Sequence, residues 1–289
     1  MRQAGPARSN PARAAPAVES TETGAFVISR LPLRIVAALG ALAVVSGCNL
    51  PPPASDPEAR AEYFEVNDPL EPVNRVTHTF NQAFDTLLLR PAAEAYRIFV
   101  PQPLRTGLGN FLDNLLLPRT TVYNALQGNP DRAASSFSRF AINSTLGVFG
   151  IFDFATDMGY PPMFEDMGQN LAVWAGTLDG GPYIVLPILG PSNVRDTTGR
   201  IIDFFTDPWQ WLGQGDTVEA LRIARIVAQA IDTREGLIEP LDALKAQSLD
   251  YYASIRSLYR QQRDRDILNQ SVGQRRYFDW TGERQGLPQ

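Results

Sequence analysis

Two residue types on which much enzyme and metal chemistry depends are almost absent from this sequence. The chain of 289 residues has one cysteine, Cys48, and one histidine, His78. A zinc site of the Cys/His type therefore lacks ligands, and a Ser-His-Asp hydrolase also lacks the Gly-x-Ser-x-Gly motif. His78 falls on the face of a predicted helix, where a structural role is more common than a catalytic one. We therefore expect neither a metal site nor histidine-based catalysis.

Phosphate-binding loops are missing as well. Gly107-Leu108-Gly109 has no third glycine and no preceding strand, and the sequence contains no P-loop. Acidic residues do occur in pairs, such as Glu165 with Asp166, and two carboxylates can in principle hydrolyse a glycoside. Helix caps and ion pairs are the more common uses of such pairs. The sequence favours a protein that is not an enzyme and that needs no cofactor.

The N-terminal region contains a hydrophobic run that is too short to cross a bilayer. Residues 35–45 are uncharged, whereas a transmembrane helix needs about 20 apolar residues. Arg30 and Arg34 precede the run and Ser46-Gly47-Cys48 follows it, which is the order of a lipoprotein signal peptide. An ordinary secretory signal, or a small buried cysteine, explains this arrangement less well. The pattern resembles a lipobox and predicts cleavage before Cys48, with covalent lipid attached to that residue.

Lipid attachment would determine where the protein is found. Two or three long acyl chains anchor a protein durably, because each buried CH₂ contributes about 0.8 kcal/mol. Asn49 follows the cysteine, and by resemblance to other lipoproteins this predicts sorting to the outer membrane, on its periplasmic face. Cleavage would leave 21 of 26 basic and 29 of 31 acidic side chains, a net charge near −8. So acidic a chain is not expected to bind nucleic acid.

Composition divides the chain into four segments. Residues 1–47 are interpreted as an N-terminal extension and signal peptide, of which the first 29 residues have the composition of a disordered segment. Residues 48–66 are interpreted as the lipidated anchor and a proline-rich spacer. Residues 67–268 form the folded body, and residues 269–289 form a flexible tail.

The folded body is predicted to be all-α. Apolar residues recur at three- and four-residue spacing from Val73 to Leu88, in a helix that Asn67 or Asp68 would cap and Pro91 would end. No sustained period-two pattern predicts strands. Further amphipathic helices are expected over residues 92–99, 104–117, 120–126, 130–146, 216–231 and 248–268.

An apolar, aromatic segment interrupts this helical pattern at residues 146–154. In a soluble protein it would be a turn in the core, because exposed apolar patches are uncommon. Beside a lipid anchor, a hairpin that faces the bilayer is the favoured interpretation. Gly147 and Gly150 permit the bend, and we propose them as the flexible positions of a gate.

Two features in the C-terminal part of the chain each have two possible interpretations. Trp209 and Trp211 either fill core space or lie at the boundary between membrane and water. The last predicted helix carries several arginines, which either form a solvated basic face or contact lipid phosphates or acidic partners. These are Arg256, Arg260, Arg263 and Arg265.

The most informative stretch is residues 164–208. Gly180, Gly181 and Pro182 predict a loop, and Ser192 or Asn193 can cap a following helix. Asp196 is favourable near the positive end of that helix, whereas Arg195 is not. We therefore expect Arg195 to pair with a carboxylate elsewhere in the body, or with a lipid phosphate.

The same stretch resembles the central signature of the MlaA (VacJ) lipoproteins. The matching residues are Glu165-Asp166, Gly168-Gln169, Trp174, Gly181-Pro182-Tyr183, Leu186-Pro187, Gly190-Pro191-Ser192, Arg195-Asp196, Gly199 and Asp203. Upstream matches in the family's order include Asn67-Asp68-Pro69, Phe80-Asn81, Arg105-Thr106-Gly107 and Asn143-Ser144-Thr145. The chain departs from the family at Ala172 and Ala175, where glycines are usual, so we expect the local packing there to differ.

The resemblance implies both a fold and a function. The fold would be a ring-like assembly of short amphipathic helices in the inner leaflet of the outer membrane, beside trimeric porins. The function would be to remove mislocalised phospholipids from the outer leaflet and to pass them to the periplasmic carrier MlaC, which maintains lipid asymmetry. Five polar residues are candidates for the lipid route or for structural roles: Asn81, Arg105, Asn143, Arg195 and Asp196. A lipid-anchored cell-wall hydrolase and a purely structural envelope lipoprotein are the alternatives.

Overall fold

The computed structural model describes residues 1, 52–53, 55–211 and 213–270. Cys48 and the preceding signal lie outside these residues, as does the tail from residue 271 onward. Lipid attachment at Cys48 therefore stays a prediction.

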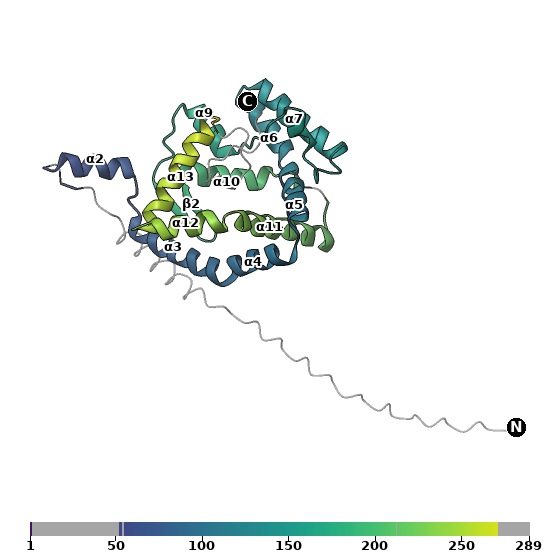
Figure 1. Cartoon of the computed structure of the whole chain (residues 1–289), viewed down its shortest axis with the longest axis horizontal. Coiled ribbons are helices and arrows are strands. Elements are labelled where there is room, and N and C mark those ends of the chain that lie inside the picture. The colour runs from purple at the N-terminus through teal and green to yellow at the C-terminus, as the bar shows by residue number, and fades with distance from the viewer. Residues whose placement is uncertain (2–51, 54, 212, 271–289) are drawn as a thin grey trace. The chain divides into compact units, whose positions relative to one another are not determined.

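Helices make up most of the described residues, as the sequence predicts (Figure 1). They are α2 (Pro57–Val66), α3 (Glu71–Phe84), α4 (Arg90–Phe99), α5 (Gln102–Asn114), α6 (Leu117–Leu126), α7 (Pro130–Thr145), α8 (Phe154–Asp157), α9 (Met167–Ala175), α10 (Val194–Thr206), α11 (Asp216–Gly236), α12 (Ile238–Gln247) and α13 (Tyr251–Ile267). A π-helical turn, η1 (Asp85–Leu89), a 3₁₀ turn, η2 (Pro208–Gln210), and two short strands, β1 (Tyr183–Leu186) and β2 (Gly190–Asn193), complete the described elements. The predicted all-α class is confirmed, with this one small hairpin added.

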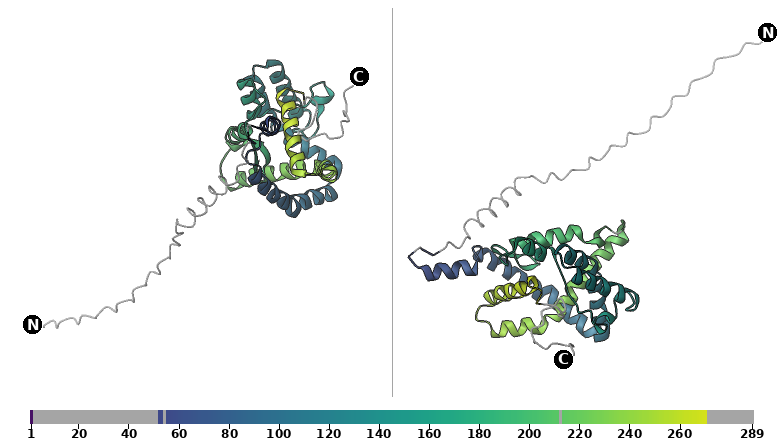
Figure 2. Two further views of the ribbon diagram at one scale, coloured as in Figure 1. Left: turned by 90° about the vertical axis from the view of Figure 1, so that its left-hand side faces the viewer. Right: turned by 90° about the horizontal axis from the view of Figure 1, so that it is seen from above.

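The helices are arranged as a closed circuit of neighbours. Helix α11 contacts α5, which contacts α7, and α7 packs along α6 (Figures 1 and 2). Helix α6 then contacts α9, α9 contacts α13, α13 contacts α12, and α12 returns to α11. The predicted ring-like assembly of short helices is therefore confirmed.

The chain passes Pro91 without leaving the helical conformation, which corrects the expectation that this proline ends a helix. Pro91 lies in the first turn of α4, directly after the π-helical turn η1. The backbone N–H of Arg90 donates to the carbonyl of Asp85, five residues earlier. A π turn is wider than an α turn, so it accommodates the ring of Pro91 and its missing N–H donor.

The β-hairpin depends on side chains of α3. Asn74 donates to the Tyr183 carbonyl at 3.0 Å and accepts from the Val185 N–H at 2.9 Å. Asn81, seven residues further along the same helix face, donates to the Leu186 carbonyl at 2.9 Å and accepts from the Ile188 N–H at 2.7 Å. Two amide side chains of one helix thus take the place of a third strand. Asn81, a candidate for the lipid route or for a structural role, makes these contacts with the β-hairpin.

Many of the most deeply buried side chains of the body are polar. Its largest fully buried side chains are Asn74, Asn124, Asn170, Thr120, Asp68, Ser136 and Ser192. Leu70 is the N-cap of α3, in place of the expected Asn67 or Asp68. Asp68 is 2% exposed and accepts hydrogen bonds from Asn74, Tyr252 and Arg256. Buried polar groups are stable only when they are paired in this way, so the interior is held by specific hydrogen bonds.

Many large apolar side chains lie on the outside. Phe99 of α4 is 81% exposed, Phe149 between α7 and α8 is 73% exposed, and Leu221 of α11 is 66% exposed. Similar side chains are exposed on α3, α5, α6 and α10. Soluble monomers rarely expose so much apolar surface, so this distribution favours contact with an apolar phase.

Within the described residues, none of the helices combines the length and the apolar character needed to cross a bilayer.

Candidate functional site

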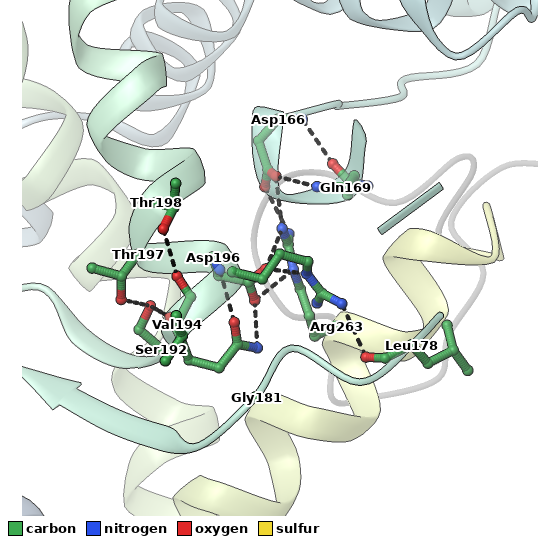
Figure 3. Close-up of polar contacts among 12 residues, drawn as sticks. Asp166, Gln169, Leu178, Gly181, Ser192, Val194, Asp196, Thr197, Thr198 and Arg263 are labelled. Carbon is green, nitrogen blue, oxygen red and sulfur yellow. Dashed lines mark hydrogen bonds and ion pairs between the residues drawn. The ribbon is translucent and has the colours of Figure 1, made fainter. Parts of the chain in front are cut away.

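The central site is a network of two arginines and two aspartates that joins α9, α10 and α13 (Figure 3). Arg263 of α13 donates from both terminal nitrogens to Asp166, at 2.7 Å each. The same guanidinium contacts Asp196, with an Nε to Oδ2 distance of 2.8 Å. Arg195 adds a second cation, with its Nε 3.0 Å from Oδ1 of Asp196.

Both aspartates lie at helix N-termini, Asp166 as the N-cap of α9 and Asp196 in the first turn of α10. Asp166 accepts from the Gln169 N–H at 2.9 Å while the Gln169 side chain accepts from the Asp166 N–H, which completes a capping box at the start of α9. Asn193 caps α10 by accepting from the Asp196 N–H at 2.7 Å, as the sequence predicts. The site is therefore built where two helix N-termini meet one arginine.

Two glycines allow these helix starts to approach each other closely. A Cβ added at Gly199 of α10 would lie 2.4 Å from the backbone nitrogen of Gly168 in α9. A Cβ added at Gly168 would lie 2.4 Å from a terminal nitrogen of Arg263. Both positions lie within the predicted signature, and at Gly199 an added side chain would meet the backbone of α9.

The charges of the network shift the pKa values of its members. Burial alone would raise the pKa of Asp166, but the charge and hydrogen bonds of Arg263 outweigh it and hold that pKa well below its usual range. Burial raises the pKa of Tyr259, and the adjacent Asp196 carboxylate, which accepts a hydrogen bond from the Tyr259 hydroxyl, raises it further. Asp166 is therefore charged at neutral pH, and Tyr259 is a neutral donor.

Arg195 does pair with a carboxylate, but with that of the adjacent residue rather than one elsewhere in the body. Its side chain is only 9% exposed, and its Nη1 donates to the Leu178 carbonyl at 3.0 Å. The guanidinium thus ties the start of α10 to the loop before β1. That loop borders a pocket of about 320 Å³ next to α13.

The apolar hairpin between α7 and α8, predicted at residues 146–154, is exposed, so it is not a turn in the core. Leu146 is 57% exposed and Phe152 is 55% exposed, in addition to Phe149. Val148, Phe149 and Gly150 all have positive φ angles, of 52°, 58° and 95°. Positive φ is strained for non-glycine residues, and such strain is typical of functional segments.

Both hairpin glycines are required by close approaches. A Cβ at Gly147 would lie 2.2 Å from the Phe152 carbonyl oxygen, and a Cβ at Gly150 would lie 2.4 Å from the Cβ of Asn114 in α5. Asn143 holds the base of the segment, since it accepts from the Ala155 N–H and donates to Asp153, at 2.9 Å each. The structure thus brings Gly147, Gly150 and Asn143 together, away from the network of Arg195 and Asp196.

Arg105 belongs to a third polar cluster, which involves α4, α5 and α11. It pairs with Glu235 of α11, which also accepts from Arg97 of α4 at 2.8 Å. These residues border a polar pocket of about 450 Å³, together with Asp232. The sequence pattern marked Arg105 but gave no indication of Arg97 or Glu235, because their pairing joins three helices.

The arginines of α13 do not form a solvated basic face. Arg256 pairs with buried Asp68 at 2.7 Å, and Arg263 pairs with Asp166 and Asp196. The alternative of acidic partners was correct for both, and the partners lie within the chain. Trp211 is 72% exposed, whereas Trp209 donates inward to the Leu115 carbonyl at 2.6 Å.

The remaining candidates for chemistry have structural partners. His78 packs against Tyr251 in a tilted arrangement and against Tyr252 edge to face, and it contacts Gln82 at 2.9 Å. Glu165 accepts from Arg132 at 2.6 Å, so the two neighbouring acids 165 and 166 each have their own arginine. Across the described ranges, no group of three or more His, Cys, Asp or Glu side chains is arranged to hold a metal ion.

Polar interior, apolar exterior and a ring of short helices together define a helical protein suited to a lipid environment. Comparison with known proteins agrees with this class. The MlaA lipoprotein family model matches residues 66–266, and the chain belongs to that family.

Individual relatives support the assignment. The chain is 35% identical over 201 residues to the intermembrane phospholipid transport system lipoprotein MlaA of Escherichia coli, covering 68% of this chain and 77% of that protein. It is 32% identical over 200 residues to the protein of the same description from Haemophilus influenzae, covering 68% and 78%. A structure described as "Structural basis for maintenance of bacterial outer membrane lipid asymmetry" matches with a TM-score of 0.60 at 32% identity, covering 69% of this chain and 98% of that one.

Proposed function

We propose that this chain is an outer-membrane lipoprotein that takes part in intermembrane phospholipid transport. It would remove mislocalised phospholipids from the outer leaflet and so maintain lipid asymmetry. The observation that carries the proposal is the inverted polarity of the body, with seven polar side chains as its largest fully buried ones and Phe99, Phe149 and Leu221 on its surface. A phospholipid needs both properties along its route, because its head is costly to bury and its tails are costly to hydrate.

The location of the protein follows from the sequence signal. Acylation at Cys48 would hold the body at the periplasmic face of the outer membrane. Exposed apolar side chains around the ring would then enter the inner leaflet from the side. Trp211, exposed beside the 3₁₀ turn, is suited to the boundary between headgroups and hydrocarbon.

Two protein partners belong to the proposal. Trimeric porins are expected beside the ring, within the membrane, where they would cover part of its apolar surface. A soluble periplasmic carrier, MlaC, is expected to receive the lipid on the side of the ring that faces water. Both partners come from the family resemblance, and the exposed apolar helices α4 and α11 are compatible with a partner inside the membrane.

The hairpin between α7 and α8 is proposed as the gate of the lipid route. It is exposed and apolar, it contains three consecutive residues with positive φ, and it rests on α5 through Asn110 and Asn114. Its positive φ angles store backbone strain, and a change in its contacts with α5 would release that strain and move the segment to a second position.

Mass spectrometry of the lipids that co-purify with the detergent-extracted protein tests the proposal. Bound phospholipid, together with no activity on murein, is the expected result. Hydrolysis of murein by the purified protein would support the cell-wall hydrolase instead. Absence of phospholipid from preparations that retain the folded body would leave the structural lipoprotein as the better interpretation.

A further inference from the structure

The pocket beside the arginine–aspartate network has a fixed wall. It has a volume of about 320 Å³, near the lower end of the range of ligand sites. Its lining comes from α13, from the loop before β1 and from the start of α10, and includes Asp179, Arg195, Tyr259, Arg260, Arg263 and Asp264. A space of this size suits a polar headgroup rather than a whole phospholipid.

The loop that closes the pocket is held in one shape. A Cβ added at Gly180 would lie 2.2 Å from Nδ2 of Asn193, so the loop backbone lies directly against the cap of α10. Asp179 accepts from the Gly181 N–H at 2.8 Å, and the Gly180 carbonyl accepts from the Arg195 N–H at 3.0 Å. The side chains of the loop are therefore presented to the pocket without a prior rearrangement.

One guanidinium of the pocket wall, that of Arg195, is incompletely hydrogen-bonded. Arg195 and Arg263 are balanced by Asp166 and Asp196 in the network behind the pocket wall. Yet Nη2 of Arg195 is buried and has no hydrogen-bond partner among the described residues. Leaving a guanidinium N–H buried and unbonded is costly, which favours an acceptor arriving from the pocket.

Charges of both signs face the same space. Arg260 and Asp264 lie one turn apart on α13 and both line the pocket, and Asp179 adds a second carboxylate from the loop. A ligand with only negative charge would meet the two carboxylates, and a ligand with only positive charge would meet Arg195 and Arg260. A ligand that carries one charge of each sign avoids both repulsions.

We propose that this pocket binds the zwitterionic headgroup of a phospholipid, of the phosphoethanolamine type. The phosphate would accept from Arg195 and Arg260, and the ammonium group would donate to Asp179 and Asp264. Leu178 and Tyr183, which also line the pocket, would contact the glycerol carbons. This inference rests on the proposed function and adds to it a preference for zwitterionic over anionic lipids.

Titration calorimetry of the full chain in detergent tests the preference. The probes are glycerophosphoethanolamine, glycerophosphoglycerol, inorganic phosphate and ethanolamine. We expect glycerophosphoethanolamine to bind saturably and at least roughly tenfold more tightly than the other three, because only it satisfies both signs of charge.

Variants separate a binding role from a structural one. Arg260→Gln should weaken both glycerophosphodiesters by roughly tenfold, whereas Asp264→Asn should weaken only glycerophosphoethanolamine. Arg265→Gln is the matched control, because Arg265 lies on the same helix, is exposed and does not line the pocket. Asp179→Asn repeats the Asp264 test from the loop and should also weaken only glycerophosphoethanolamine.

The inference is overturned if inorganic phosphate binds as tightly as glycerophosphoethanolamine, which would indicate a free-phosphate site. Equal weakening of both diesters by Asp264→Asn would also overturn it, because a general structural effect has no charge preference. If only the headgroup proposal is wrong, phospholipid still co-purifies in the same amount, but without a headgroup preference. Failure of the proposed function removes the co-purified phospholipid itself, so the two failures are distinguishable.

Discussion

Arg263 and Asp166 form a two-pronged ion pair, with both N–O distances at 2.7 Å, although they are 97 residues apart in the sequence. The arginine belongs to the last helix of the described body and the aspartate caps α9. Since the same guanidinium contacts Asp196 in the first turn of α10, one side chain fixes the position of three helices. Such directed contacts hold these helices together, in addition to the apolar packing of Tyr183, Val185 and Tyr252.

Arg263→Gln is expected to destabilise the body by about 3 kcal/mol. Breaking a buried ion pair typically costs 3–5 kcal/mol, and the lower value applies because Asp196 would keep Arg195. The measurement is thermal unfolding in detergent. Arg265→Gln, an exposed neighbour on the same helix, should change stability by less than about 0.5 kcal/mol. Similar melting temperatures for the two variants would show that the pair does not hold the three helices.

Acid should weaken the body partly through Asp166. Its pKa is held low in the folded state, so its contribution is fully present above the unfolded pKa of about 4 and is lost as the pH falls further, toward the folded pKa. We expect the melting temperature to fall between about pH 4 and pH 2. In Asp166→Asn the fall should be smaller, because that carboxyl no longer titrates. An identical acid dependence in the variant would contradict the assigned pKa shift.

The sequence predicted the helices better than the contacts between them. Three- and four-residue spacing located most helices, and the Asn193 cap of α10 was identified because caps depend on neighbours in the chain. The burial of Asp68 and the pairing of Arg97 with Glu235 depend on residues more than a hundred positions away, which local patterns do not encode. The same reason explains why the β-hairpin, which needs Asn74 and Asn81 of α3, was not expected.

Gly150→Val tests the proposed gate. The substitution would force Asn114 away and would shift the balance between hairpin positions, so we expect altered phospholipid exposure at the cell surface with the protein still present. Gly159→Val is a close control, because Gly159 has a similar φ of 88° but no heavy atom within 4 Å of its added Cβ. It should carry the same backbone strain without an effect on surface phospholipid.

Protein abundance and melting temperature are measured for the Gly150→Val variant together with its surface phospholipid. If Gly150→Val lowers both in step with function while Gly159→Val does not, the contact with Asn114 determines the fold and not a gate. Gly147→Val should behave like Gly150→Val, since its Cβ would meet the Phe152 carbonyl within the same hairpin.

Cys48→Ala tests the anchor. The variant should not be acylated and should stay uncleaved or mislocalised, because the chain has no second cysteine to modify. Labelled palmitate followed by fractionation of the envelope is the measurement. Incorporation of label into the Ala variant would refute lipid attachment at this position.

Transport of phospholipid away from the outer leaflet is tested most directly by complementation. The full-length gene, or an empty vector, is placed in a Gram-negative strain whose own MlaA-family gene has been deleted, and phospholipid accessible at the cell surface is measured. We predict less surface phospholipid with the gene than with the vector, and no decrease with Cys48→Ala. Equal surface phospholipid with and without the wild-type protein, at normal abundance in the outer membrane, would contradict the proposed function.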